Sequence, residues 1–109
     1  MFSNTMDFSK ALVELKAGKK LTRKGWNGNV VSFQPEMYIW LEKPTRIERD
    51  TVDPSDENLL SAFGRYGSMD KLGTFVMRTR DNKLMFGWLA TNADLLAEDW
   101  VVVEDTRIF

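Results

Sequence analysis

Residues 88–100 read WLATNADLLAEDW, and this stretch organises the predicted fold. Thr91 is a favourable N-cap residue and Asp94 follows three residues later, so each side chain can accept a hydrogen bond from a backbone amide of the first helical turn. The spacing predicts a short helix over 92–97, between the end of one strand and the start of the next. A helix of this length is not stable alone. The tryptophans at the two ends of the stretch are expected to hold it, because each indole has a large apolar surface and one N–H donor.

The side chains of this short helix suggest two different surroundings. We expect Leu95 and Leu96 to face the core. Asn92 and Asp94 lie near the N-terminal end, where the unpaired backbone amides of residues 91–93 are available to an anionic ligand. We interpret the flanking tryptophans first as core residues and second as surfaces on which a ligand stacks.

The composition favours a single domain. The chain has 109 residues, 43% of them hydrophobic, which is enough for one core. Fifteen basic and sixteen acidic residues give a net charge of −1, so no overall field favours duplex nucleic acid or an anionic membrane. The sequence has neither an apolar run of about eighteen residues nor a secretory signal, so we expect a cytoplasmic protein.

The chain contains no cysteine and no histidine. Disulfides and thiolate zinc sites are therefore excluded, and the common pairs of nucleophile and base cannot be assembled. Carboxylates, lysine, tyrosine and hydroxyl groups remain as possible catalytic groups. Binding, without a cofactor or metal, is therefore a better expectation than catalysis.

A helix and a basic strand are predicted near the N-terminus. Asp7 is the expected N-cap, and Gly18 supplies the left-handed residue that ends the helix. Between them, apolar residues recur at the spacing of one helical face: Phe8, Ala11, Leu12 and Leu15. Residues 19–24 are then predicted to form a strand at the surface. This region places five cations and no acid within nine residues: Lys16, Lys19, Lys20, Arg23 and Lys24.

This basic strand and the turn after it are candidates for ligand binding. A charge run is usually a solvated face, but Arg23 and Lys24 can also attract phosphate. Residues 25–29 are predicted to form a tight turn. This turn directs the Trp26 side chain either outward or onto the neighbouring strand. The indole then either covers an open end of the sheet or stacks on a flat ring of a ligand.

Four further strands complete the predicted fold. Residues 37–41 are apolar at every position and are expected to form a central strand covered on both faces. Residues 74–80 and 83–88 form a predicted hairpin about a two-residue turn at 81–82, and 100–104 form the last strand. The predicted fold class is α+β: a small antiparallel sheet of about five strands, with an N-terminal helix packed on it and a short helix between the last two strands.

One sheet face then needs another layer. Tyr38 and Trp40, or their neighbours, are expected to supply it by self-association, so we predict a symmetric homo-oligomer.

Residues 44–73 are predicted to form an excursion from the single domain of residues 1–109. Asp53 is the expected N-cap of a helix with Pro54 at its first position, and three apolar residues precede Gly64: Leu59, Leu60 and Phe63. A connection of this length is usually a lid, a binding loop or an assembly arm.

Two segments of the chain carry the pattern of a known family. The first begins with FSKAL at 8–12 and runs through GKK at 18–20 to RKGWNG at 23–28, and the second is WLAT at 88–91 followed by DLLAEDW at 94–100. Together they resemble the small phage and prophage family called Thoeris anti-defence protein 2. The resemblance implies a sponge, which binds without cleaving the cyclic ADP-ribose isomer made by a bacterial Thoeris immune system. It also implies homotetramers with pockets at subunit contacts. Some members of the family hold cyclic dinucleotides or related immune signals in separate pockets.

A cyclic ADP-ribose-type ligand has a flat adenine, two riboses and a pyrophosphate. Its receptor needs an aromatic surface, amide or carboxylate groups for the hydroxyls, and cations or helix amides for the phosphates. The candidate ligand-binding residues are Arg23, Lys24, Trp26, Asn27, Trp88, Thr91, Asn92 and Asp94. Of these we favour Trp26 and Asn92.

Three alternatives remain open at the level of sequence. The first is a sponge for the cyclic di- or oligonucleotide signals of a CBASS-type system. The second is an enzyme that degrades the nucleotide with Asp94 or Asp99 as base. The third is a protein-interaction module that binds a host protein through the excursion.

Overall fold

The computed structural model describes residues 5–27 and 35–104, with no account of the Asn27 side chain. The chain divides into two compact units. The first contains the residues up to Glu42 and from Thr74 onward, and the second contains Lys43–Gly73. None of the helices in the described ranges is long and apolar enough to cross a membrane.

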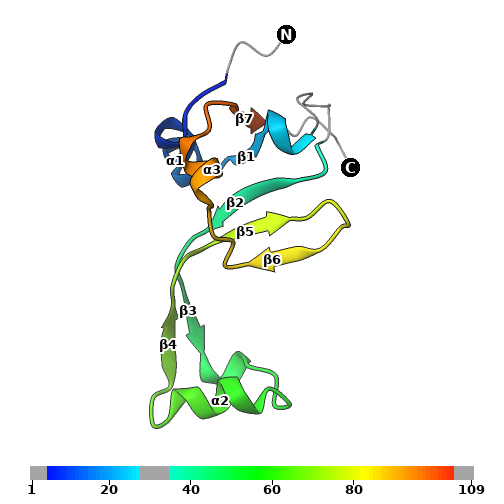
Figure 1. The fold of residues 1–109 in the computed structure, drawn as a ribbon. Coiled ribbons are helices and arrows are strands. Elements are labelled where there is room, and N and C mark those ends of the chain that lie inside the picture. Colours follow the sequence, from blue (N-terminus) through cyan, green and yellow to red (C-terminus); the bar gives the residue numbers. More distant parts are fainter. Residues whose placement is uncertain (1–4, 28–34, 105–109) are drawn as a thin grey trace. The chain divides into compact units, whose positions relative to one another are not determined.

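The first unit is built on a five-stranded antiparallel sheet (Figure 1). Its strands are ordered β6-β5-β2-β1-β7. Their bounds are β1 Lys20–Arg23, β2 Tyr38–Glu42, β5 Thr74–Arg78, β6 Leu84–Phe86 and β7 Trp100–Val103. The predicted α+β fold with about five antiparallel strands is therefore confirmed. The basic strand β1 was expected at the surface, but it lies between β2 and β7 and buries Leu21 and Thr22 completely.

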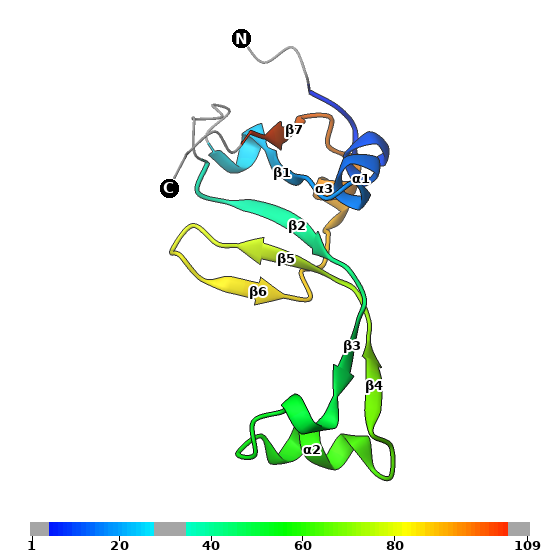
Figure 2. The same cartoon turned by 180° about the vertical axis from the view of Figure 1, so that it is seen from behind.

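Helix α1, Phe8–Lys16, covers one face of this sheet (Figure 2). The Asp7 side chain accepts a hydrogen bond from the Lys10 amide, and Gly18 has a positive φ of 97° after the helix end, as the sequence predicted. The buried core on this face combines the helix with strand residues from across the sheet: Ala11, Leu15, Leu21, Ile39, Met77, Trp88 and Trp100.

The opposite face of the sheet is only partly covered by described residues. Directly paired residues share a face, which places Tyr38 with Leu84 and Trp40 with Phe86. Tyr38 and Trp40 are half-buried, whereas Leu84 and Phe86 are exposed. The expectation that β2 is covered on both faces is therefore wrong for this part of the chain, because only Ile39 of that strand is fully buried.

The hairpin of β5 and β6 closes differently from the prediction. The Thr79 amide donates to the Lys83 carbonyl at 2.8 Å, so three residues lie in the loop and both strands are shorter than expected. Asn82 alone has a positive φ, 65°, among the described residues other than glycine. A three-residue loop with one left-handed residue is a common hairpin connection, and it replaces the predicted two-residue turn.

The second unit is a hairpin with a helical tip. Its elements are β3 Thr45–Glu48, η2 Arg49–Thr51, α2 Glu57–Phe63 and β4 Ser68–Lys71. Phe63 is buried and the Arg49 guanidinium lies 5.8 Å from its ring centroid. The N-cap of α2 is Asp56 rather than the predicted Asp53, whose carboxylate instead accepts hydrogen bonds from the amide and hydroxyl of Ser55.

The two strand pairs follow one antiparallel register. Glu42 pairs with Thr74 at the end of the β2–β5 ladder. Three residues further along each strand, Thr45 pairs with Lys71 at the start of the β3–β4 ladder. The excursion is therefore the continuation in sequence of a single hairpin, interrupted at Lys43–Pro44 and Leu72–Gly73.

Candidate functional site

The segment from Trp88 to Trp100 contains helix α3, Asn92–Leu96, which ends one residue earlier than predicted. The predicted capping box is present. Thr91 Oγ1 accepts from the Asp94 amide at 3.2 Å, and the Thr91 amide donates to Asp94 Oδ2 at 2.9 Å. These two amides are therefore occupied, and the expectation that the Thr91 amide is available to an anionic ligand is wrong.

The buried side of α3 is polar rather than apolar. Asp94 is 6% exposed, whereas Leu95 and Leu96 are 46% and 80% exposed, so the prediction that these leucines face the core is also wrong. The reason is that the Asp94 carboxylate has partners inside: it binds Thr91 through one oxygen and Arg23 through the other. A five-residue helix has little more than one turn, and this turn is oriented by its carboxylate.

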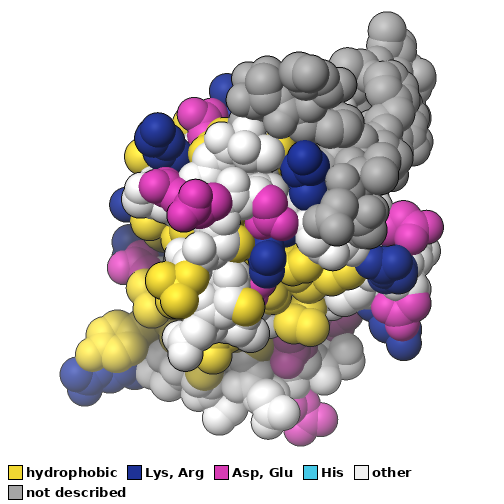
Figure 3. Space-filling view, turned by 45° about the horizontal axis from the view of Figure 1, so that its top comes forward, with side chains coloured by type: hydrophobic (Ala, Val, Ile, Leu, Met, Phe, Trp, Pro, Cys, Tyr) yellow, Lys and Arg dark blue, Asp and Glu magenta, His cyan; other side chains and the backbone are white. Residues whose placement is uncertain are grey.

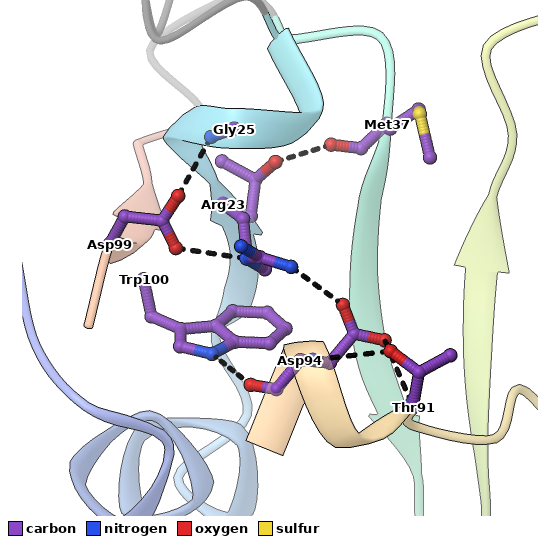
Figure 4. A network of polar contacts seen from close by, with 8 residues as sticks. Arg23, Gly25, Met37, Thr91, Asp94, Asp99 and Trp100 are labelled. Carbon is purple, nitrogen blue, oxygen red and sulfur yellow. Dashed lines mark hydrogen bonds and ion pairs between the residues drawn. The ribbon is translucent and has the colours of Figure 1, made fainter. Parts of the chain in front are cut away.

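Arg23 of β1 joins two aspartates (Figure 4). Its Nη1 lies 2.9 Å from Asp94 Oδ1, and its Nε lies 2.9 Å from Asp99 Oδ1. Asp99 Oδ2 accepts a further hydrogen bond from the Gly25 amide at 2.8 Å. The Arg23 side chain is only 18% exposed. This network ties the end of β1 to both α3 and the start of β7.

The positive charge of Arg23 stabilises the ionised forms of Asp94 and Asp99. Burial by itself raises the pKa of Asp94, but the hydrogen bonds from the Thr91 amide and Arg23 outweigh it, so the pKa lies below its ordinary value. Burial is likewise outweighed at Asp99, where Arg23 and the Gly25 amide lower the pKa. Both carboxylates are thus ionised acceptors at neutral pH. Every buried polar side-chain atom in the described residues has a hydrogen-bond partner.

Three tryptophans pack edge to face beside this network. The Trp26 ring lies 5.1 Å from that of Trp100 and 6.0 Å from that of Trp88. Trp100 is fully buried, and its Nε1 donates to the Asp94 carbonyl at 2.9 Å. Trp88 is 9% exposed, and both residues belong to the core, as first interpreted. Trp26 is half-buried, so part of this residue is accessible to solvent.

The structure brings most of the predicted site residues together. Arg23, Asp94 and Thr91 form one hydrogen-bonded chain, and Trp26 contacts Trp88. Asn92 is exposed at the start of α3, and within the described part of the chain its side chain makes no hydrogen bond. Lys24 is half-buried in the single turn η1, Lys24–Asn27. The side chain of Asn27, and Gly28 and Asn29 of the predicted turn, lie outside the described residues.

Two residues that contact the turn carrying Trp26 were not among the predicted site residues. Asp99 was considered only as a catalytic base, although it anchors the turn that carries Trp26. Arg80, in the loop after β5, donates through Nη2 to the Trp26 carbonyl, and the same nitrogen lies 3.8 Å from Met37 Sδ. Neither contact could be recognised from the sequence. The Asp99–Gly25 contact and the Arg80–Trp26 contact each join residues more than fifty positions apart.

One face of the molecule carries side chains of both charge signs (Figure 3). In the face shown in Figure 3, basic and acidic side chains are interspersed with apolar patches. Within the described ranges, Asp and Glu form no group of three or more that is placed to hold a metal ion.

Comparison with known proteins identifies the family. A family model described as "Thoeris anti-defense 2-like domain" matches residues 6–103. The chain belongs to the Thoeris anti-defence 2 family. The match extends through the excursion, beyond the two segments on which the resemblance was based.

A curated relative supports the same assignment. The chain is 31% identical over 99 residues to the protein "Thoeris anti-defense 2" of Bacillus phage SP01, a match that covers 90% of this chain and 94% of that protein. Membership of the Thoeris anti-defence 2 family supports an anti-defence role for the chain.

Proposed function

We propose that the protein is a sponge that binds and sequesters a cyclic ADP-ribose-type immune signal in the cytoplasm of an infected bacterium, without cleaving it. Family membership supports the anti-defence role. The mode of action and the ligand class are inferred from the residues around Trp26 and α3.

The observation that carries this proposal is a half-buried tryptophan, Trp26, that packs against two core tryptophans in the same unit as the exposed amide of Asn92. Trp26 packs at near-perpendicular angles against Trp88 and Trp100, and this half-buried residue keeps accessible surface that we assign to a flat base. Asn92, two residues before the Arg23-bound Asp94, offers an amide donor and acceptor to ribose hydroxyls. A preorganised aromatic surface with a few polar groups is the arrangement that ground-state binding of a nucleotide requires.

The cation for the pyrophosphate is assigned differently from the sequence-based hypothesis. Arg23 is committed to two carboxylates and is mostly buried. Arg80 is exposed and lies at the Trp26 carbonyl, so it is the better candidate for a phosphate contact. Lys24, which precedes Trp26 in the same turn, stays the second candidate.

The state of the carboxylates favours sequestration over turnover. An acid or base in catalysis needs a pKa near the working pH and access to the reacting proton. The pKa values of Asp94 and Asp99 are instead lowered by Arg23 and backbone amides, and their oxygens are occupied by these donors. The chain has no histidine or cysteine to take their place.

We further propose that the protein assembles as a homotetramer. The sheet face of Tyr38, Trp40, Leu84 and Phe86 supports association, because these large side chains are half-buried or more than half exposed. This assembly is the second layer that the sequence predicts for the uncovered face.

Native mass spectrometry tests ligand and assembly together. The protein is incubated with cyclic ADP-ribose isomers and, in parallel, with cyclic di- and oligonucleotides. We expect a tetramer that retains a cyclic ADP-ribose isomer. Retention of cyclic oligonucleotides alone would favour a CBASS-type sponge, and a particle of 12.6 kDa, the mass of one chain, would contradict the assembly. Retention of no nucleotide would favour a protein-interaction module.

A further inference from the structure

We infer that Asp99 is a positioning residue for the signal: it fixes the turn η1 so that Trp26 presents its ring to the nucleotide. This inference rests on the proposed function, because it assigns a role within the same site. It concerns a residue that does not itself touch the ligand.

Asp99 makes three hydrogen bonds, one to the last residue of β1 and two to η1. Its Oδ1 accepts from Arg23 Nε at 2.9 Å, and its Oδ2 accepts from the Gly25 amide at 2.8 Å. Its backbone carbonyl accepts from the Lys24 amide at 3.1 Å. The three residues immediately before Trp26 are therefore all bound to this one aspartate. A single 3₁₀ turn has weak internal hydrogen bonds, so these outside contacts set its position.

The position of η1 decides where the Trp26 ring lies. The ring meets Trp100 at 5.1 Å with an interplanar angle of 78°, and it meets Trp88 at 6.0 Å with an angle of 79°. Both contacts are edge contacts, and they leave the ring's orientation dependent on the backbone that carries it. Movement of the turn therefore changes the surface that Trp26 offers for stacking.

The carboxylate is chemically suited to this role. An ionised aspartate accepts on two oxygens at once, so it can bind Arg23 and the Gly25 amide together. An asparagine has one acceptor oxygen and must give up one of the two contacts. Asp99→Asn therefore keeps the size of the side chain but releases either the guanidinium or the turn.

Gly25 provides an independent way to disturb the same contact. A Cβ atom at this position would lie 3.1 Å from Asp99 Oδ2 and 3.6 Å from an Arg23 Nη atom. Gly25→Ala therefore crowds the carboxylate without removing any charge. Glu98→Gln serves as the matched control, because Glu98 is the exposed neighbour of Asp99 and its loss removes the same charge.

The experiment measures two properties of each variant. The near-ultraviolet circular dichroism of the ligand-free protein reports the packing of the tryptophans. Glycocyclic ADP-ribose, one of the cyclic ADP-ribose isomers, is the ligand. Isothermal titration calorimetry at a temperature well below the unfolding midpoint reports its dissociation constant. We expect Asp99→Asn and Gly25→Ala to change the tryptophan signal and to weaken binding by about tenfold, the scale of losing a stacked base. Glu98→Gln is expected to change neither.

A merely structural role would lower the unfolding midpoint but leave the affinity of the folded protein unchanged. Wild-type affinity in both Asp99→Asn and Gly25→Ala would therefore overturn this inference and leave the proposed function intact. If the wild-type protein binds none of the cyclic ADP-ribose isomers, glycocyclic ADP-ribose included, the proposed function fails and this inference fails with it. An unaltered tryptophan signal in both variants would also overturn it.

Discussion

Arg23 Nη1 and Asp94 Oδ1 lie 2.9 Å apart, so two residues that the sequence analysis proposed as separate ligand-binding candidates bind each other. Their side chains are 18% and 8% exposed. Asp99 adds a second carboxylate to the same guanidinium. The basic strand therefore contributes to the fold through Arg23, and a change at this residue affects stability before it affects any ligand.

Arg23→Ala is expected to destabilise the protein by about 3 kcal/mol, because it leaves two largely buried carboxylates without their common partner. Urea denaturation followed by circular dichroism measures the free energy of unfolding. Lys19→Ala is the control, since Lys19 forms an exposed ion pair with Glu14 and is expected to cost less than about 1 kcal/mol. Equal stability of the Arg23→Ala and Lys19→Ala variants would show that the buried network contributes little.

Acid is expected to weaken the folded state through Asp94 and Asp99. The pKa values of both groups are lowered in the folded protein, so their stabilisation is complete above the unfolded value of about 3.9 and is lost as the pH falls through the folded values. Unfolding free energies measured from pH 7 down to pH 2.5 should therefore decline below about pH 4. The Asp94→Asn variant should be less stable at pH 7 and should decline less steeply. Parallel curves for the two proteins would refute the assignment.

The excursion is expected to be dispensable for the five-stranded sheet. Glu42 and Thr74 are paired neighbours on β2 and β5, so an Asn-Gly turn in place of residues 43–73 can close the hairpin directly. We expect the shortened protein to keep its circular dichroism spectrum and its affinity for the signal. Loss of affinity in a folded protein would instead place part of the binding function in the excursion.

Substitutions at the proposed site are expected to weaken binding without unfolding the protein. Asn92→Ala and Arg80→Ala change exposed side chains, and loss of a hydrogen bond to a charged phosphate at Arg80 should cost about 1.5–3 kcal/mol of binding free energy. Trp26→Ala should abolish stacking, with some loss of stability from its contacts with Trp88 and Trp100. Calorimetric titration of the nucleotide measures each effect. Arg65→Ala, an exposed arginine of the second unit, is the control that should bind normally.

Local signals in the sequence predicted the local structure well. The Asp7 cap and the Thr91–Asp94 capping box follow from spacings of three residues, and the structure confirms both. The antiparallel sheet follows from alternating and β-branched runs. These features depend on neighbours within one or two turns of the chain, which a single sequence displays directly.

Long-range features were predicted less well. The Arg23 ion pairs join residues 71 and 76 positions apart, and they exist only because β1 lies beside β7. The exposure of Leu95 and Leu96 follows from the same network, which turns Asp94 inward. In the second unit, Asp53 and Asp56 are of the same residue type, which favours N-cap positions. Asp53 accepts a hydrogen bond from the Ser55 amide instead, and Asp56 is the N-cap of α2.

The most direct test of the central claim is the chemical state of the signal after release. The protein is incubated with glycocyclic ADP-ribose, washed free of unbound nucleotide, and heated until it denatures. The supernatant is then analysed by mass spectrometry and applied to a Thoeris effector. A sponge binds the ground state of its ligand without lowering the barrier to cleavage, so we predict an intact cyclic nucleotide that still activates the effector. A linear or hydrolysed product above the level of a protein-free control would show that the protein is an enzyme.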